Sequence, residues 1–156
     1  MLGIPPARLW LEALPGGKPH LPDHPGLFFN LSHSGDWIVL ATASHGQVGV
    51  DIETIDSTFP AMEIAEEFFL EEERRWIRKG ADSTLRFFQL WTAKEALMKA
   101  TGEGMSLPPD QILITTSRDR LLTATNLRTG RAHELLTETA APAGMALCTV
   151  FLTDGE

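Results

Sequence analysis

The stretch "QVGVDIETID", residues 47–56, predicts the strand on which the rest of the fold depends. β-Branched side chains recur there at every second position: Val48, Val50 and Ile52. Alternation with a period of two is typical of a strand that turns one face into the core. Asp51 and Glu53 then share the opposite face, although two like charges so close together repel each other. The pattern therefore predicts a strand whose two carboxylates both bind a third group.

The composition of the 156 residues is that of a folded globular chain, with 43% hydrophobic and 22% charged residues. The net charge of −8 argues against a nucleic-acid partner, because such binding is built from Lys and Arg contacts to phosphate. A small phosphorylated ligand is still allowed, since it needs only a local cationic pocket or a bridging ion. The single cysteine, Cys148, excludes a disulfide framework and a cysteine metal site.

The chain carries no apolar run of membrane-spanning length, which is about 18 residues. Its first residues, "MLGIPPARLW", lack the charged-then-apolar order of a secretion signal. We therefore expect no membrane partner and a cytoplasmic location.

Periodicity and turn residues predict an α+β fold rather than a wound parallel sheet, because helices are grouped between strands with short connections. Residues 1–26 are rich in Pro and Gly and predict a loop with one short strand near 9–14. Further strands are predicted over 27–31, 37–43, 47–53, 111–116, 120–126 and 145–152, with a turn over 32–36. Helices are predicted from Pro60 to Gly80 and over 84–101, while 127–140 shows no clear pattern.

The helix over 84–101 is apolar nearly all round, which is typical of a buried helix. Trp91, Glu95 and Lys99 are spaced four apart and therefore share one stripe. Glu95 and Lys99 form an ordinary surface ion pair on one interpretation. On the other, they are functional groups in a partly dry cleft beside Trp91.

Two carboxylates on the strand and one on the helix suit Mg²⁺, an ion that prefers oxygen ligands and is usually completed by substrate phosphates. No side chain is an obvious covalent nucleophile. The residue types therefore favour metal-assisted phosphoryl transfer, in which positioning and charge neutralisation carry the chemistry.

Four motifs occur in a characteristic order: "GGKP" (16–19), "FNLSHSGDW" (29–37), "VGVDIE" (48–53) and "LWTAKEALMKATGEGMSLP" (90–108). In that order and spacing they resemble the 4'-phosphopantetheinyl transferase superfamily, in its larger surfactin-synthetase-activating (Sfp) type. The resemblance implies a pseudo-dimer of two α+β lobes, each a small antiparallel sheet packed with helices. It also implies Mg²⁺-dependent transfer of the 4'-phosphopantetheine group from coenzyme A, the co-substrate, to a serine of an apo acyl or peptidyl carrier protein. Adenosine 3',5'-bisphosphate is then released.

The resemblance assigns roles to residues of the motifs. The Mg²⁺ ligands are Asp51, Glu53 and Glu95, and Glu95 is also the base that takes the serine proton. Lys99 steadies the pyrophosphate and the departing phosphate. The contacts to coenzyme A phosphates are Lys18, Ser32 and His33. Lys94 belongs to the motif, but its direction off the helix argues against a catalytic role.

Against the family pattern, residues 1–47 form a partial, shortened N-terminal lobe and 48–154 a complete C-terminal lobe with the metal site. In the family, the region before "SHS" usually supplies Lys and Arg contacts to the coenzyme A 3'-phosphate, but here Arg8 and Lys18 are the only Lys or Arg residues before that motif. Three explanations stay open: a start further upstream, a natural short form, or a second subunit over the exposed edge. The expected state is a monomer or weak oligomer.

Two other functions stay open. The chain is then either a catalytically idle remnant that binds coenzyme A or a carrier protein, or a Mg²⁺ phosphodiesterase that acts on coenzyme A alone. The aromatic residues Phe68, Phe69 and Trp76 are expected in the core, with a carrier interface as the alternative. "EEERR" (71–75) is expected to be a solvated helix face.

Overall fold

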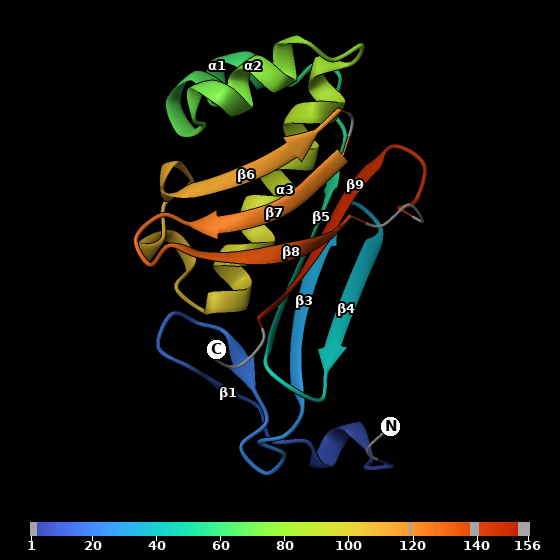
Figure 1. Cartoon of the computed structure of the whole chain (residues 1–156). Helices are drawn as coiled ribbons and strands as arrows, with labels where there is room; N and C mark the ends of the chain where they lie inside the picture. The colour runs from blue at the N-terminus through green and yellow to red at the C-terminus, as the bar shows by residue number, and fades with distance from the viewer. Residues whose placement is uncertain (1–2, 119, 138–140, 153–156) are drawn as a thin grey trace.

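The computed structural model describes residues 3–118, 120–137 and 141–152, which form the α+β fold that the sequence predicts (Figure 1). Its strands are β1 Glu12–Ala13, β2 Pro19–His20, β3 Phe28–Ser34, β4 Trp37–Ala43, β5 Gln47–Thr54, β6 Ile112–Ser117, β7 Arg120–Asn126, β8 Arg131–Thr137 and β9 Met145–Leu152. Its helices are α1 Ala61–Phe68, α2 Glu71–Arg78 and α3 Ser83–Thr101, with 3₁₀ turns η1 Pro6–Arg8, η2 Gly104–Ser106 and η3 Pro109–Gln111.

Five strands form an antiparallel sheet in the order β5-β9-β8-β7-β6. β5 pairs along its whole length with β9, so that Asp51 lies opposite Cys148. The sequence did not predict β8, because Leu135 is buried while its neighbour Leu136 is exposed on the other face. Leucines on both faces hide the alternation of period two on which the prediction relies.

β3 and β4 form a separate hairpin, and β1 with β2 forms a third, very short sheet. β3 runs through Ser34, so the predicted turn over 32–36 is wrong for its first three residues. Ser32 and Ser34 therefore share one face of an extended strand. β3 runs parallel to β5 beside it (Figure 1).

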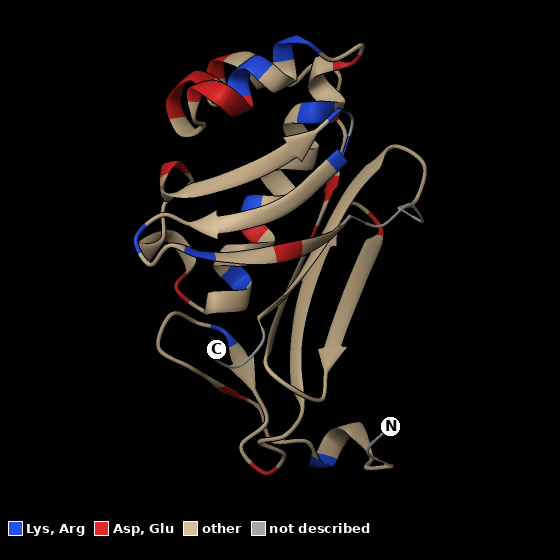
Figure 2. Ribbon diagram, viewed as in Figure 1, with Lys and Arg blue, Asp and Glu red and all other residues tan. Residues whose placement is uncertain are grey.

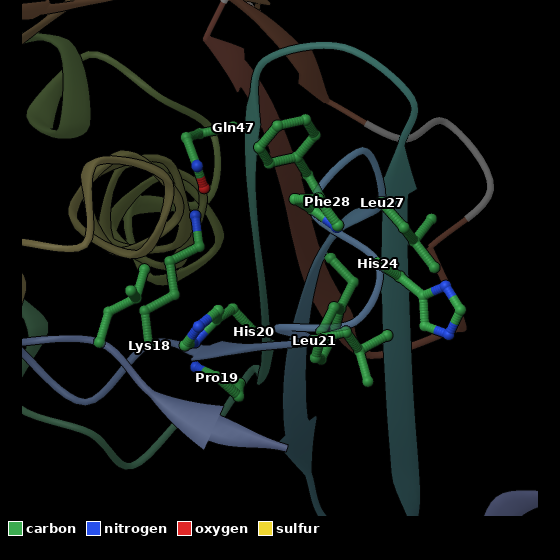
Figure 3. Close-up of a pocket in the computed structure, with 11 residues that line it drawn as sticks. Lys18, Pro19, His20, Leu21, His24, Leu27, Phe28 and Gln47 are labelled. Carbon is green, nitrogen blue, oxygen red and sulfur yellow. The ribbon is translucent and has the colours of Figure 1, made fainter. Parts of the chain in front are cut away.

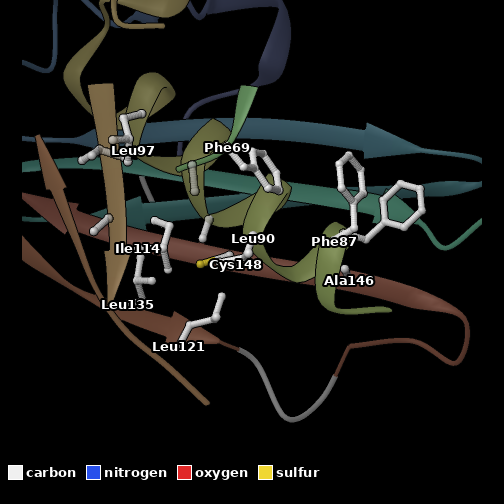
Figure 4. Close-up of a cluster of buried hydrophobic side chains, with 14 of the residues drawn as sticks. Phe69, Phe87, Leu90, Leu97, Ile114, Leu121, Leu135, Ala146 and Cys148 are labelled. Carbon is white, nitrogen blue, oxygen red and sulfur yellow. The ribbon is translucent and has the colours of Figure 1, made fainter. Parts of the chain in front are cut away.

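α3 packs across β5 and β9 and forms the centre of the core (Figure 4). Leu90 and Leu97 of this helix are fully buried, and each contributes about 1.5–3 kcal/mol by leaving water. Asp82 begins the helix by accepting a hydrogen bond from Leu85 N at 2.9 Å, so the helix starts at Ser83, one residue before the predicted start at residue 84. Gly102, with φ 73°, ends the helix in the left-handed region as expected.

The helix predicted from Pro60 to Gly80 is two helices, because Phe69 and Leu70 are extended. Phe69 turns into the core, where its ring stacks on Phe87 at a centroid distance of 5.2 Å. The carboxylate of Glu73 accepts the Leu70 N–H and begins α2. Tertiary packing therefore overrides a continuous helical pattern here.

The β3–β4 hairpin carries exposed apolar side chains, of which Ile38 is 76% and Leu40 59% accessible. A groove of about 510 Å³ runs between this hairpin and the N-terminal segment, and Ile4, Leu11 and Leu31 line it. No helix among the described residues has both the length and the apolar character needed to cross a membrane.

Candidate functional site

Gly49 lets α3 approach β5 closely enough to bring the helix and strand motifs together. A Cβ atom at position 49 would lie 2.0 Å from Ala96 O and 2.4 Å from Ala100 N, so only glycine fits. Gly49, Asp51 and Glu53 lie on one face of β5, and this face therefore meets the helix that carries Glu95 and Lys99. Figure 2 shows the acidic segments of β5 beside the charged segments of α3.

Asp51 lies at the centre of the site and is only 3% exposed. Its Oδ1 accepts hydrogen bonds from Lys99 Nζ at 2.6 Å and from Ser32 Oγ at 2.8 Å. The Lys99 ammonium also donates to Ser32 Oγ at 3.0 Å. The predicted residues Ser32, Asp51 and Lys99 are thus in direct contact, although they come from β3, β5 and α3.

Glu53 and Glu95 flank this centre and are both partly buried. Ser34 Oγ donates to Glu53 Oε2 at 3.3 Å. The charges of Asp51 and Lys99 both act on the Glu95 carboxylate. The interpretation of Glu95 and Lys99 as an ordinary surface ion pair therefore does not describe this site, since the salt bridge of Lys99 is to Asp51.

The three carboxylates disfavour one another's charge. Burial raises the pKa of Asp51, and Lys99 with Ser32 opposes the rise. Burial and the neighbouring Asp51 charge raise the pKa of Glu53, and the same two causes raise the pKa of Glu95. Three acids with one ammonium carry an excess of negative charge that a cation would neutralise.

Among the residues that the structure describes, no hydrogen-bond donor reaches the buried Asp51 Oδ2. A buried carboxylate oxygen without a donor is costly, at about 1–3 kcal/mol or more, and native structures contain few such atoms. Within the described ranges, however, no three acidic, His or Cys side chains converge on one point as they would around a bound ion. Carboxylate oxygens are ligands that fit a hard divalent cation. In this structure, however, the Lys99 ammonium binds the Asp51 carboxylate.

Lys18 lies at the C-terminal end of α3, where its Nζ donates to Val48 O at 3.0 Å and to Ala100 O at 2.8 Å. Burial lowers the pKa of this lysine from its ordinary 10.5 to about 8. Its side chain also lines a pocket of about 200 Å³ with His20 and Gln47 (Figure 3). Lys18 therefore links β5 to α3 through hydrogen bonds. Its contact with coenzyme A stays a prediction.

His33 is exposed and alternates with Ser32 and Ser34 along β3, so it lies on the opposite face of that strand. The structure does not bring its ring to the Asp51 centre. Its predicted contact with a coenzyme A phosphate stays a prediction as well.

A groove of about 220 Å³ adjoins the centre on the side of Lys99. Gly16, Gly17, Gly102 and Gly104 line it together with Lys18, Pro19, Asn30, Leu31, Met98 and Lys99. Backbone is accessible where glycines line a wall, and two lysines also line this groove. Such a wall suits an elongated anionic ligand.

Sequence reasoning missed a buried ion pair between α2 and α3. Lys94 Nζ lies 2.9 Å from Glu73 Oε2, with the two side chains 1% and 0% exposed. Lys94 also donates to Pro109 O at 2.8 Å and to Ile112 O, while Glu73 Oε1 accepts the Ile114 N–H at 2.8 Å. The expectation of a solvated "EEERR" face is therefore wrong for Glu73, although its spacing from Phe69 and Ile77 indicated an inward direction.

The aromatic residues named above divide between core and edge. Phe69 and Trp76 are buried, at 4% and 8% exposure, as expected for core residues. Phe68 is partly buried and contacts Trp91 edge-to-face at 6.4 Å. Asn30 and Ser34, which the prediction had not singled out, both bond to β5.

The fold and site define a small α+β protein that places an acidic strand against a helix bearing Glu and Lys. A solved structure with this fold is the holo-[acyl-carrier-protein] synthase of Thermotoga maritima, with a TM-score of 0.55 and 16% identity. The similarity covers 70% of this chain and 64% of that one and concerns the fold.

The family model of the 4'-phosphopantetheinyl transferase superfamily matches residues 47–150, and the chain belongs to that superfamily. Among curated relatives, 4'-phosphopantetheinyl transferase Sfp of Bacillus subtilis (strain 168) is 41% identical over 106 residues, which are 66% of this chain and 46% of the relative. The 4'-phosphopantetheinyl transferase gsp of Aneurinibacillus migulanus is 39% identical over 110 residues, covering 69% and 44%. The chain spans about half the length of the curated relatives it matches.

Proposed function

We propose that the protein transfers the 4'-phosphopantetheine group of coenzyme A to a serine hydroxyl of an apo carrier protein, in a Mg²⁺-dependent reaction. The observation that carries the proposal is the Lys99–Asp51–Ser32 contact, which joins three of the family motifs at one buried point. The named relatives support the same activity.

Asp51, Glu53 and Glu95 would hold the Mg²⁺ ion, and the partnerless Asp51 Oδ2 supports this assignment. When bound, the ion would neutralise charge between the carboxylates and a diphosphate. For all three carboxylates to reach it, the three side chains must come closer together and the Lys99 ammonium must move off Asp51 Oδ1. Lys99 is 29% exposed and can make that movement.

The chain's own side chains then have separate tasks. Glu95 accepts the proton of the carrier serine, whose oxygen forms the new bond to phosphorus as the bond to the bisphosphate breaks. Lys99, released toward the groove, places its positive charge where the departing phosphate gains negative charge. Lys94 has no place in this scheme, because all its donors are used in the core.

The glycine-lined groove beside Lys99 would take part of coenzyme A, with Lys18 at its far side. Ser32 and His33 would contact its phosphates, as the family motif implies. Residues 1–47 would be a partial N-terminal lobe and 48–154 a complete lobe, of which 153 and 154 lie outside the described residues. The exposed apolar face of β3–β4 supports this division, because a complete first lobe would cover such a surface.

A monomer or weak oligomer in the cytoplasm belongs to the same proposal, and a sequence with a single cysteine, the buried Cys148, fits a reducing compartment. The test incubates the chain with apo carrier protein, coenzyme A and Mg²⁺ and follows the intact mass of the carrier. We expect a phosphopantetheine adduct that disappears without Mg²⁺ and in a Glu95→Gln variant. A matched control is Glu67→Gln, which neutralises an exposed carboxylate on α1 and should keep the activity.

Absence of the adduct with several carriers would contradict the proposal. If coenzyme A nevertheless bound tightly in calorimetry, the chain would be a binding remnant. Cleavage of coenzyme A without any carrier would instead indicate a phosphodiesterase.

A further inference from the structure

β5 is an end strand of the five-stranded sheet, and its outer edge is bonded by side chains rather than by another strand's backbone. The N–H groups of alternate β5 residues point away from β9 toward β3. The three bonds join Val50 N to Asn30 Oδ1 (2.9 Å), Ile52 N to Ser32 Oγ (3.4 Å) and Thr54 N to Ser34 Oγ (2.9 Å). We call this set the side-chain ladder. It satisfies an edge that would otherwise be unpaired.

Two rungs of the side-chain ladder have a second contact. The hydroxyl of Ser32 donates to Asp51 Oδ1 at 2.8 Å, and that of Ser34 donates to Glu53 Oε2 at 3.3 Å. Asn30 bonds to the β5 backbone and to neither carboxylate. The two serines are therefore placed to orient the carboxylates, while Asn30 serves the edge alone.

The hydrogen-bonding capacity of Ser34 determines where its proton points. A hydroxyl donates one hydrogen bond and accepts two. The Thr54 N–H occupies one acceptor position, and the Thr54 hydroxyl, at 3.1 Å, can occupy the other by donating. The proton of Ser34 is then left for Glu53, so that every hydrogen-bonding position of the hydroxyl is used.

Glu53 depends on this contact for its direction. Within residues 3–118, 120–137 and 141–152, the Ser34 hydroxyl is the one hydrogen-bond donor that reaches its carboxylate. The Glu53 side chain is only partly buried. Rotation about its side-chain bonds can turn the carboxylate in many directions even though the β-carbon is held by the strand. Without the hydroxyl, Glu53 would sample directions that leave the site.

We propose that Ser34 is a positioning residue that aims Glu53 at the Mg²⁺ site, an inference that rests on the proposed function. Its hydroxyl touches no reacting atom and acts through Glu53. Partners that orient metal-binding carboxylates typically contribute about 10–100-fold in metal affinity. The 3.3 Å length of this bond places the expected effect near the lower end, at about tenfold.

The experiment measures Mg²⁺ binding by calorimetry, without coenzyme A or carrier, in the wild-type chain and three variants. Ser34→Ala removes the hydroxyl and the acceptor for Thr54 N. Asn30→Ala is the matched control, because it also removes an acceptor for a β5 N–H but leaves both carboxylates their donors. Ser34→Thr keeps a hydroxyl at the same position. Thermal unfolding is recorded for all of them.

We expect both alanine variants to lose thermal stability, because each leaves a β5 N–H without its acceptor. Only Ser34→Ala should bind Mg²⁺ about tenfold more weakly, and Ser34→Thr should restore the affinity to within about threefold of wild type. Equal loss of affinity in Ser34→Ala and Asn30→Ala would show a merely structural role and overturn the inference, as would unchanged affinity in Ser34→Ala. If Ser34→Ala does not fold, the comparison of Ser34→Thr with a Ser34→Cys variant, a much weaker donor, decides in the same way. A wild-type chain that binds no Mg²⁺ would instead contradict the metal site of the proposed function, and this inference with it.

Discussion

The Lys99 ammonium lies 2.6 Å from Asp51 Oδ1, which joins the helix motif to the strand motif across 48 residues of sequence. Solvent reaches the two side chains unequally, since the Lys99 side chain is 29% exposed and the Asp51 side chain 4%. The carboxylate is therefore held in place while the ammonium has room to move. This asymmetry suits a site in which a lysine can give way to an ion.

Replacing Asp51 by asparagine should weaken Mg²⁺ binding by at least about tenfold while the fold is kept. Asn offers an oxygen to Ser32 and Lys99 in the same position, but it loses the charge that a cation requires. Calorimetry with Mg²⁺ and thermal unfolding measure the two effects. Asp36→Asn, in the exposed turn after β3, is the control and should bind like the wild type. Unchanged affinity in Asp51→Asn would remove Asp51 from the metal site.

Replacing Glu95 by glutamine should abolish transfer to the carrier, because the amide neither accepts the serine proton nor carries a ligand charge. We expect a rate at least about 100-fold lower, which is the usual contribution of a general base. Mass spectrometry of the carrier measures the rate. The melting temperature should stay close to that of the wild type, since Glu95 is only partly buried. A variant that keeps the wild-type rate would refute the role of base.

Gly49→Ala should be one of the most destabilising single substitutions in the chain. The new methyl group would lie 2.0 Å from Ala96 O, so α3 must move off β5. Overpacking of this kind typically costs about 1–3 kcal/mol, and more where backbone must shift. Urea denaturation measures the loss. Gly26→Ala is the control, because a Cβ there meets no atom within 4 Å, and its effect should stay within about 0.5 kcal/mol.

The buried pair Lys94–Glu73 should show strong coupling in a double-mutant cycle. Lys94→Met or Glu73→Leu alone leaves a charge buried without its partner, which typically costs about 3–5 kcal/mol. The double variant should lose clearly less than the two single losses combined, since no bare charge is left. Chemical unfolding of the four proteins gives the coupling energy. Additive losses would mean that the two charges do not stabilise each other.

Lys18 should make stability depend on pH in alkaline solution. Its pKa in the folded chain is about 8, against an ordinary 10.5, so between these values the unfolded chain binds more protons than the folded one. Stability then increases as pH rises from about 8 to 10.5, by at most about 3 kcal/mol. The measurement is the free energy of unfolding of the wild type relative to Lys18→Met, for which other titrating groups cancel. In Lys79→Met, which removes an exposed lysine, the free energy of unfolding should change with pH as it does in the wild type. If the difference in unfolding free energy between the wild type and Lys18→Met did not change with pH, the lowered pKa of Lys18 would be contradicted.

Much of the local structure could be read from the chain, because local patterns encode which face of an element is apolar. Alternation around Val50 predicted β5 with its acids on the face opposite the valines, and the apolar helix before Gly102 ended where its glycine indicated. The predicted proximity of Ser32, Asp51 and Lys99 rested on the family motifs rather than on periodicity, since these residues are far apart in sequence.

Tertiary structure alone decided the contacts that orient the site. A period of two reveals that Ser32 and Ser34 share a face, but not that this face meets the edge of β5. Helical spacing over 61–79 could not show that Phe69 leaves the helix or that Glu73 meets Lys94, because those contacts join residues distant in sequence. The sequence by itself determined the elements and the residue types of the site. Their directions depend on which surfaces pack together, and that is settled only when the whole core is buried.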